Sequence, residues 1–335
     1  MEPNDVLTAI WAGIVAFAVF TYVVLDGFDL GIGILFPLLG HESERGTAMN
    51  SVAPVWDGNE TWLVLGGGGL MAAFPLAYAV VMPAIYTPLI AMLLGLVFRG
   101  VAFEFRWRAV SGRRYWDFAF ATGSTVAALA QGIALGTVLQ GVAVADRAYS
   151  GGWWDWLTPF TILCGLSLAC GYAALGACWL HLKTEGSLHG RARRLALIAG
   201  VGLVVSMAAV SIATPFLDGA YFHRWLAWPN VLWTGTVPFL VAMTTAGYFL
   251  TLARGRELAP FLLALVLFLL NFIGLAISMF PYIVPHSISI WDAAAPANTQ
   301  SFMLVGALIL VPVILTYTGY SYWIFRGKVR AGGYH

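Results

Sequence analysis

The stretch VLDGFDLGIGILFPLLG, residues 24–40, places two carboxylates inside an otherwise apolar run. No charged residue lies between Asp5 and Asp26, and an apolar stretch of about 18 residues or more predicts a membrane-spanning helix. Asp26 and Asp29 are three residues apart, so a helix would present them on one face. Ionisable side chains inside a membrane helix usually face the bundle interior or a wet cavity and mark ion or proton pathways. The stretch therefore predicts a membrane helix with two buried acids.

The whole chain has the composition of a membrane protein. Of its 335 residues, 60% are hydrophobic and 10% are charged, whereas soluble domains carry about 25% charged residues. The net charge of +1 argues against a nucleic-acid partner. The spacing of the three cysteines fits no metal or redox motif. The sequence predicts an all-α polytopic membrane protein without a metal site.

The apolar segments predict nine membrane-spanning helices joined by short connections. They cover residues 8–39, 52–74, 77–105, 117–139, 157–180, 195–217, 230–252, 259–282 and 300–325. The first segment would be about 48 Å long at 1.5 Å per residue, which exceeds a hydrocarbon core of about 30 Å. Gly27, Gly31, Gly33 and Pro37 therefore predict places where this helix bends or packs closely against another helix.

The basic residues predict how the chain is oriented, because Lys and Arg concentrate on the cytoplasmic side of a membrane. With the N-terminus outside, the nine spans place all but two of the 17 basic residues inside. The two exceptions are Arg147 and Arg224. The tryptophan-rich loop GGWWDW, residues 151–156, then falls outside, as expected for an interfacial aromatic belt. The N-terminus is therefore predicted to be periplasmic and the C-terminus cytoplasmic.

Further acids accompany the first pair at a similar depth. Asp57 and Glu60 open the second span with the same three-residue spacing, and the first two spans form a hairpin whose helices are expected to be neighbours. Glu104 lies near the inner end of the third span. Four carboxylates, with Glu104 as a fifth, are thus predicted to converge in the cytoplasmic half. Clustering and burial raise the pKa of at least one member, which permits proton uptake near neutral pH.

A structural interpretation of these acids stays open. They would then bind Asn59, Trp62 or the backbone, or pair with Arg99, and so fix the packing of the helices. Glu104 is an equal candidate for a salt bridge with Arg99 or Arg106. The clustering favours the functional interpretation.

The histidines predict that haem is held elsewhere. The six are His41, His181, His189, His223, His286 and His335, and each is predicted at a loop or a terminus. A membrane haem held by histidine needs that residue inside a span. The glycine run at 66–69 has no following Lys-Ser or Lys-Thr pair, so it is interpreted as a close-packing surface rather than a phosphate loop.

Several motifs together resemble one family. They are DGFDLGIG (26–33), NSVAPVWDGNETWL (50–63), FRGVAFEFR (98–106), the TGS…LQG stretch (122–141), and MFPYIVP followed by SIWDA (279–294). In this order they resemble subunit II of cytochrome bd-type quinol oxidases, and they span nearly the whole chain. In its short length, the chain most resembles members of the cyanide-insensitive branch of that family.

The resemblance implies a fold and a complex. The expected fold is a first four-helix bundle (1–140), a second one (157–282) and a peripheral ninth helix (300–325). The expected partner is subunit I, which carries haem b and haem d, or a third haem b, and a small single-span third subunit often joins the pair. Such a complex in the bacterial inner membrane oxidises quinol, reduces dioxygen to water and takes protons from the cytoplasm.

The resemblance also implies roles for individual residues. Asp26, Asp57 and Glu104 resemble a proton route towards the haem site, and the depth of Glu60 adds it to this set. Asp29 and Trp56 resemble a pair that contacts a structural quinone in some members. No catalytic residue is expected in this chain.

Two other functions fit the same residues. A proton-coupled secondary transporter would use intramembrane acids and glycine-rich helices, and a broken first helix would suit it. A structural scaffold would need the acids only as hydrogen-bonding groups.

Overall fold

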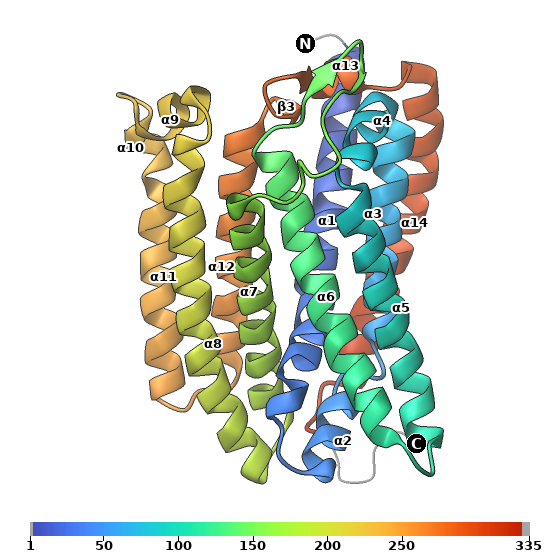
Figure 1. Cartoon of the computed structure of the whole chain (residues 1–335), viewed down its shortest axis with the longest axis vertical. Helices are drawn as coiled ribbons and strands as arrows, with labels where there is room; N and C mark the ends of the chain where they lie inside the picture. The colour runs from blue at the N-terminus through green and yellow to red at the C-terminus, as the bar shows by residue number, and fades with distance from the viewer. Residues whose placement is uncertain (1–2, 330–335) are drawn as a thin grey trace.

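The computed structural model describes residues 3–329 as a bundle of long helices with short connections (Figure 1). Arg330 and His335, which entered the sequence predictions, lie outside the described residues. The long helices are α1 (Pro3–Leu35), α3 (Trp56–Ala73), α5 (Tyr86–Arg108), α6 (Arg113–Leu139), α7 (Pro159–Lys183), α8 (Gly186–Ala213), α11 (Thr236–Ala253), α12 (Leu258–Met279) and α14 (Ala297–Ile324).

The remaining elements are short. The short helices are α2 (Glu42–Asn50), α4 (Pro75–Ala84), α9 (Gly219–Leu226), α10 (Val231–Thr234) and α13 (Ile290–Ala293), with 3-10 turns η1 (Phe36–Leu38) and η2 (Thr214–Phe216). Two antiparallel hairpins pair β1 (Val144–Ala145) with β2 (Ala148–Tyr149), and β3 (Tyr282–Val284) with β4 (Ile288–Ser289). The all-α prediction therefore holds except for these two small hairpins.

Eight helices of the described chain are long and apolar enough to cross a membrane. The predicted second span, 52–74, corresponds to α3, which has 18 residues but begins with a polar turn that contains Asp57, Asn59 and Glu60. Its composition therefore keeps it out of the eight. The chain is a multi-pass helical membrane protein, and the count of nine spans stays a prediction.

The predicted third span, 77–105, is two helices rather than one. α4 ends at Ala84 and α5 begins at Tyr86, with Ile85 between them. Pro88 has no backbone N–H, so the helical hydrogen bond to the carbonyl of Ala84 is missing where the chain breaks. The prediction of one continuous helix was wrong because proline positions were not weighed against the apolar pattern.

α1 is continuous through its glycines. It runs to Leu35, and η1 follows with Pro37. Gly31 instead permits a close crossing with α7, because a Cβ there would collide with the carbonyl oxygen of Tyr172. On α7, a Cβ on Gly176 would lie 2.5 Å from the carbonyl carbon of Gly31. The glycines of α1 therefore serve packing, which was one of the two predicted uses.

The hydrophobic core does not stop at the boundary between 1–140 and 157–282. One cluster of buried residues contains Phe28 and Ile32 of α1, Phe103 of α5 and Leu175 of α7. α14 lies against α1 and α3, with most of its surface open (Figure 1). The division into two four-helix bundles and a peripheral helix stays a prediction.

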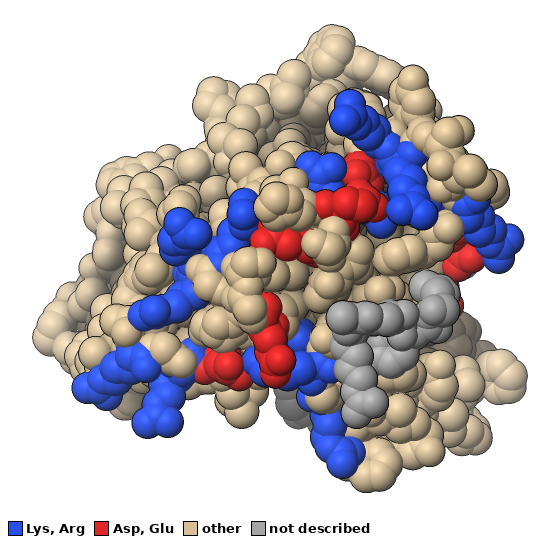
Figure 2. Space-filling model, turned by 90° about the horizontal axis from the view of Figure 1, so that it is seen from below, with Lys and Arg blue, Asp and Glu red and all other residues tan. Residues whose placement is uncertain are grey.

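The two ends of the bundle differ in charge. We call the end that carries α2, the turns after α5, α7 and α11, and the end of α14 the basic end. Lys and Arg gather there, with several Asp and Glu among them (Figure 2). The N-terminus lies at the opposite end, as do the β-hairpins and α9 (Figure 1). The periplasmic placement of that opposite end stays a prediction.

Candidate functional site

Arg99 joins acids from two other helices in the interior of the bundle. Its Nη1 donates to Asp26 Oδ1 at 2.6 Å, and its Nη2 donates to Glu60 Oε1. The side chains of Arg99 and Asp26 are completely buried, whereas that of Glu60 is 27% exposed. One guanidinium on α5 therefore holds a carboxylate of α1 and another of α3. We call Arg99, Asp26 and Glu60 the Arg99 cluster.

Asp29 has a different partner from Asp26. Asn59 Nδ2 donates to Asp29 Oδ2 at 2.8 Å and to the Leu25 carbonyl at 3.2 Å. The hydroxyl of Tyr322, on α14, donates to Asn59 Oδ1 at 3.0 Å. Both aspartates are completely buried, yet they diverge, one towards α5 and the other towards α3 and α14. The structural alternative weighed from the sequence, with Asn59 and Arg99 as partners, matches these contacts.

Each buried aspartate keeps one oxygen without a hydrogen bond to another described residue. These atoms are Asp26 Oδ2 and Asp29 Oδ1, and Arg99 Nε is also unpaired. A buried polar atom without a partner is costly, and a protonated carboxyl gains a donor as well as keeping acceptors. Among the described residues, these two aspartate oxygens are therefore buried acceptors that no donor satisfies.

The structure does not bring Asp57 or Glu104 into the Arg99 cluster. Asp57 is exposed in the first turn of α3. The Glu104 side chain is 64% exposed and lies 3.8 Å from Arg108, one turn further along α5. Its predicted salt bridge with Arg99 or Arg106 is replaced by this exposed pair. Of the predicted acids, Asp26 and Glu60 meet at Arg99, Asp29 lies beside them, and two face outwards.

The predicted pair of Asp29 and Trp56 has separate surroundings. The Trp56 ring stacks on Phe103 with centroids 4.8 Å apart and planes 6° apart. Asp29 instead faces Asn59. The quinone contact of these two residues stays a prediction.

A second ionic cluster at the basic end was missed from the sequence. Arg106 is buried and donates to Asp117 at 2.5 Å and to Glu42 at 2.8 Å, and Arg45 binds the other oxygen of Asp117 at 3.0 Å. Arg99 and Arg106 are seven residues apart, so they share one face of α5. That spacing was the available signal, but Arg106 had been weighed only as an orientation charge and as a partner of Glu104, not as a partner of Asp117 or Glu42.

A hydrogen-bonded chain above Asp26 was also missed. Tyr172 donates to Gln131 Oε1 at 2.8 Å, and Gln131 Nε2 donates to the Tyr22 hydroxyl at 2.6 Å. Tyr22 lies one helical turn before Asp26, on the same face of α1. These contacts join α1, α6 and α7 next to the Arg99 cluster. Together with Tyr322 of α14, they extend the polar contacts to six helices.

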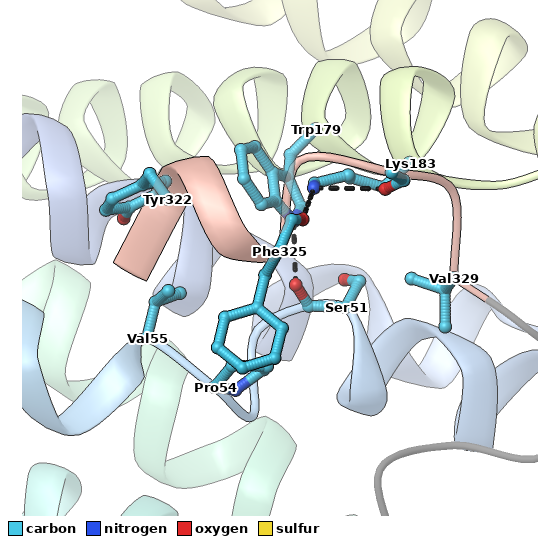
Figure 3. A pocket seen from close by; sticks show the side chains of 9 residues that line it. Ser51, Pro54, Val55, Trp179, Lys183, Tyr322, Phe325 and Val329 are labelled. Carbon is cyan, nitrogen blue, oxygen red and sulfur yellow. Dashed lines mark hydrogen bonds between the residues drawn. The ribbon is translucent and has the colours of Figure 1, made fainter. Parts of the chain in front are cut away.

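A small pocket lies at the basic end, between the α2–α3 turn, the end of α7 and the end of α14 (Figure 3). Lys183 donates to the carbonyls of Phe325 and, at 3.2 Å, Gly327, and so holds the segment after α14 against α7. Tyr322 lines the pocket and reaches Asn59 with its hydroxyl. Tyr322 therefore connects the pocket to Asn59, the residue that binds Asp29.

The prediction that every histidine lies at a loop or terminus was wrong for three of them. His181 is in the last turn of α7, His189 is in α8 and His223 is in α9. The rings of His181 and His189 have centroids 4.2 Å apart, which leaves no room for a haem macrocycle between them. No group of three or more His, Cys, Asp or Glu within residues 3–329 could hold a metal ion.

Comparisons with known proteins agree over nearly the whole chain. The model of a family described as cytochrome bd terminal oxidase subunit II matches residues 7–325. The chain is 31% identical to the cytochrome bd-I ubiquinol oxidase subunit 2 of Escherichia coli K12, over 98% of this chain and 97% of the relative. It is 28% identical to the cytochrome bd ubiquinol oxidase subunit 2 of Bacillus subtilis, over 96% of both.

A solved structure has the same fold. The bd oxidase from Geobacillus thermodenitrificans aligns with a TM-score of 0.76, over 96% of this chain and 100% of that chain. The two sequences are 16% identical, so this likeness concerns the fold alone.

Proposed function

Because the chain belongs to the cytochrome bd terminal oxidase subunit II family, we propose that it is the subunit without haem in a terminal quinol oxidase. The complex would oxidise quinol, reduce dioxygen to water and take the protons from the cytoplasm. The chain is a multi-pass protein of the bacterial inner membrane. Its work in the complex would be to stabilise the haem subunit and to supply protons.

Haem b and haem d, or a third haem b, would lie in the partner subunit I and would supply electron transfer and oxygen chemistry when bound. The pair of His181 and His189 is in keeping with this division, because their rings pack too closely to flank a macrocycle. A small third subunit and a structural quinone near Asp29 and Trp56 belong to the same proposal.

The proton route would enter at Glu60 and continue to Asp26. Glu60 is the member of the Arg99 cluster that reaches the surface of α3, and Asp26 is completely buried behind Arg99. Arg99 holds both carboxylates at adjacent nitrogens and stays charged, so it lowers the cost of burying them but carries no proton itself. Asp57 and Glu104, exposed near the same end, would form the outer part of the route where the partner covers them.

The observation that carries this proposal is the guanidinium of Arg99, which is shared between a buried and a partly exposed carboxylate. The test is Glu60→Gln in the complex purified through a tag on this chain. We expect dioxygen reduction to slow at least tenfold while the haem absorption spectrum is unchanged, because an amide of the same size cannot carry a proton. Glu185→Gln, an exposed acid at the α7–α8 turn, is the matched control and should keep wild-type turnover.

Two other outcomes would contradict the route. Loss of haem from the Glu60→Gln complex would mean that this acid acts in assembly. Wild-type turnover in the same variant would exclude an essential route through it.

A further inference from the structure

Three arginines at the basic end are exposed and unpaired. Arg194 lies in the first half of α8, Arg254 directly follows α11, and Arg256 lies in the turn to α12. Within the described chain, none of the three has a carboxylate within 4.0 Å. Arg106 and Arg108 of α5 are different, because each faces an acid. The three guanidinium groups therefore present positive charge that the chain itself does not balance.

A neighbouring arginine fixes the place of this group. Arg193 donates from Nε to the Leu252 carbonyl and from Nη2 to the Ala253 carbonyl, both at 2.8 Å. These bonds tie α8 to the last turn of α11, so Arg194 on α8 and Arg254, the residue that follows α11, lie at the same corner of the molecule. Gly255 then turns the chain sharply with a φ of +68°, which a side chain would strain.

Exposed apolar side chains lie along α8 and α11 next to these arginines. On α8, Ile198, Val201 and Val205 follow Arg194 at intervals of four, three and four residues, which is one face of a helix. They are 70%, 54% and 63% exposed. On α11, Met243 and Leu250 precede Arg254 by eleven and four residues, again on one face, and are 61% and 50% exposed. Each helix therefore has an exposed apolar stripe that ends in an unpaired arginine.

We propose that this corner of α8 and α11 binds one anionic phospholipid, with its phosphate against Arg194, Arg254 and Arg256 and its acyl chains along the two stripes. Guanidinium groups suit phosphate oxygens in number and geometry. An acidic soluble protein would leave the stripes uncovered, and a zwitterionic lipid would add no net negative charge. The site is separate from the Arg99 cluster, so it stands whether or not that cluster carries protons.

The test uses native mass spectrometry of the complex purified through a tag on this chain. The complex is first incorporated into vesicles of phosphatidylglycerol and phosphatidylcholine in equal amounts. Each basic residue beside an anionic headgroup strengthens binding by about fivefold, so Arg194→Gln, Arg254→Gln and Arg256→Gln together should weaken retention of phosphatidylglycerol by about 100-fold. We expect one phosphatidylglycerol fewer than on the wild-type complex and an unchanged amount of phosphatidylcholine.

The matched control removes the same charge at another part of the basic end. Arg108→Gln, Arg113→Gln and Arg114→Gln together should keep the wild-type number of phosphatidylglycerol molecules. Loss of the same lipid in this control would overturn the proposal, because net charge alone would then explain retention. An unchanged phosphatidylglycerol count in the first variant would overturn it as well. If that variant does not assemble, the single change Arg254→Glu is read in the same way.

Discussion

At Arg99, one guanidinium balances two carboxylates inside the bundle. Breaking a buried ion pair by removing one partner is strongly destabilising, because the remaining charge has neither water nor a counter-charge. Loss of Arg99 would affect Asp26 most. Asp26 is completely buried, and among the described residues it forms an ion pair with Arg99 alone. Glu104 lies on the same helix as Arg99 but points outwards, so it takes no part in the cluster.

Replacing Arg99 with Met should lower the free energy of unfolding by about 3–5 kcal/mol. Adding Asp26→Asn to that variant should restore part of the loss, because it removes one unpaired charge. The measurement is the thermal unfolding midpoint of the purified complex, followed by tryptophan fluorescence. Arg114→Met, at an exposed position, is the control and should change little. Equal midpoints for Arg99→Met and the wild type would show that the cluster does not hold the helices together.

Glu44 provides a pH-dependent contact at the basic end. Burial would raise its pKa, but Ser187 at 3.0 Å, the Gly40 N–H at 3.2 Å and the charge of Arg191 outweigh this effect and hold the pKa below its ordinary value. The pKa is lower in the folded chain, so the carboxylate stabilises the fold above its unfolded pKa of about 4.3. That contribution is lost as the pH falls through the folded value.

Glu44→Gln should therefore lower the unfolding midpoint at neutral pH and have a smaller effect below pH of about 4. Unfolding midpoints of both complexes across this pH range check the prediction. A difference between variant and wild type that stays constant down to the acid end would contradict it.

At the scale of helices, close crossings are built from glycine pairs. α1 crosses α7 at Gly31 and Gly176, and α5 crosses α6 at Gly95 and Gly123, where each added Cβ would meet backbone of the other helix. Small residues at crossings let helices approach closely where no hydrophobic effect drives them together. The run at 66–69 is only partly of this kind, because Gly66 and Gly69 face α1 side chains while the middle two face open space.

Gly31→Ala should push α1 and α7 apart and lower the free energy of unfolding by about 1–3 kcal/mol or more. Gly67→Ala is the matched control, since nothing lies within 4 Å of an added Cβ there. Thermal unfolding of the two purified complexes separates them. A Gly31→Ala complex as stable as the Gly67→Ala complex would mean that the crossing tolerates a methyl group.

For the molecule as a whole, the apolar pattern was sufficient to predict the long helices, apart from the break between α4 and α5, and the burial of Asp26 and Asp29. The pattern could not predict whether an acidic side chain near a helix end faces the interior or the surface. Glu104 is five residues from Arg99, or about 140° around a helix, so it faces outwards when Arg99 faces inwards. Arg106 is seven residues away and returns to the inner face. Which side of α5 faces the interior can be determined only once one of its residues is known to be buried.

The tertiary partners were beyond the sequence for a different reason. Tyr322 reaches Asn59 across 263 positions, and Gln131 links tyrosines of α1 and α7. No local periodicity predicts such contacts, because they depend on how the helices are arranged around α1. The break at Ile85 was available in the sequence through Pro88, whereas the polar first turn of α3 obscured whether that helix belongs with the other spans.

The central claim is that this chain works as the subunit without haem of a quinol oxidase. The most direct measurement is the optical absorption spectrum of the material purified through a tag on this chain. We expect haem absorption bands together with a second, larger membrane subunit that co-purifies in equal amount. A folded chain that purifies alone, without haem absorption, from cells that express both subunits would contradict the claim.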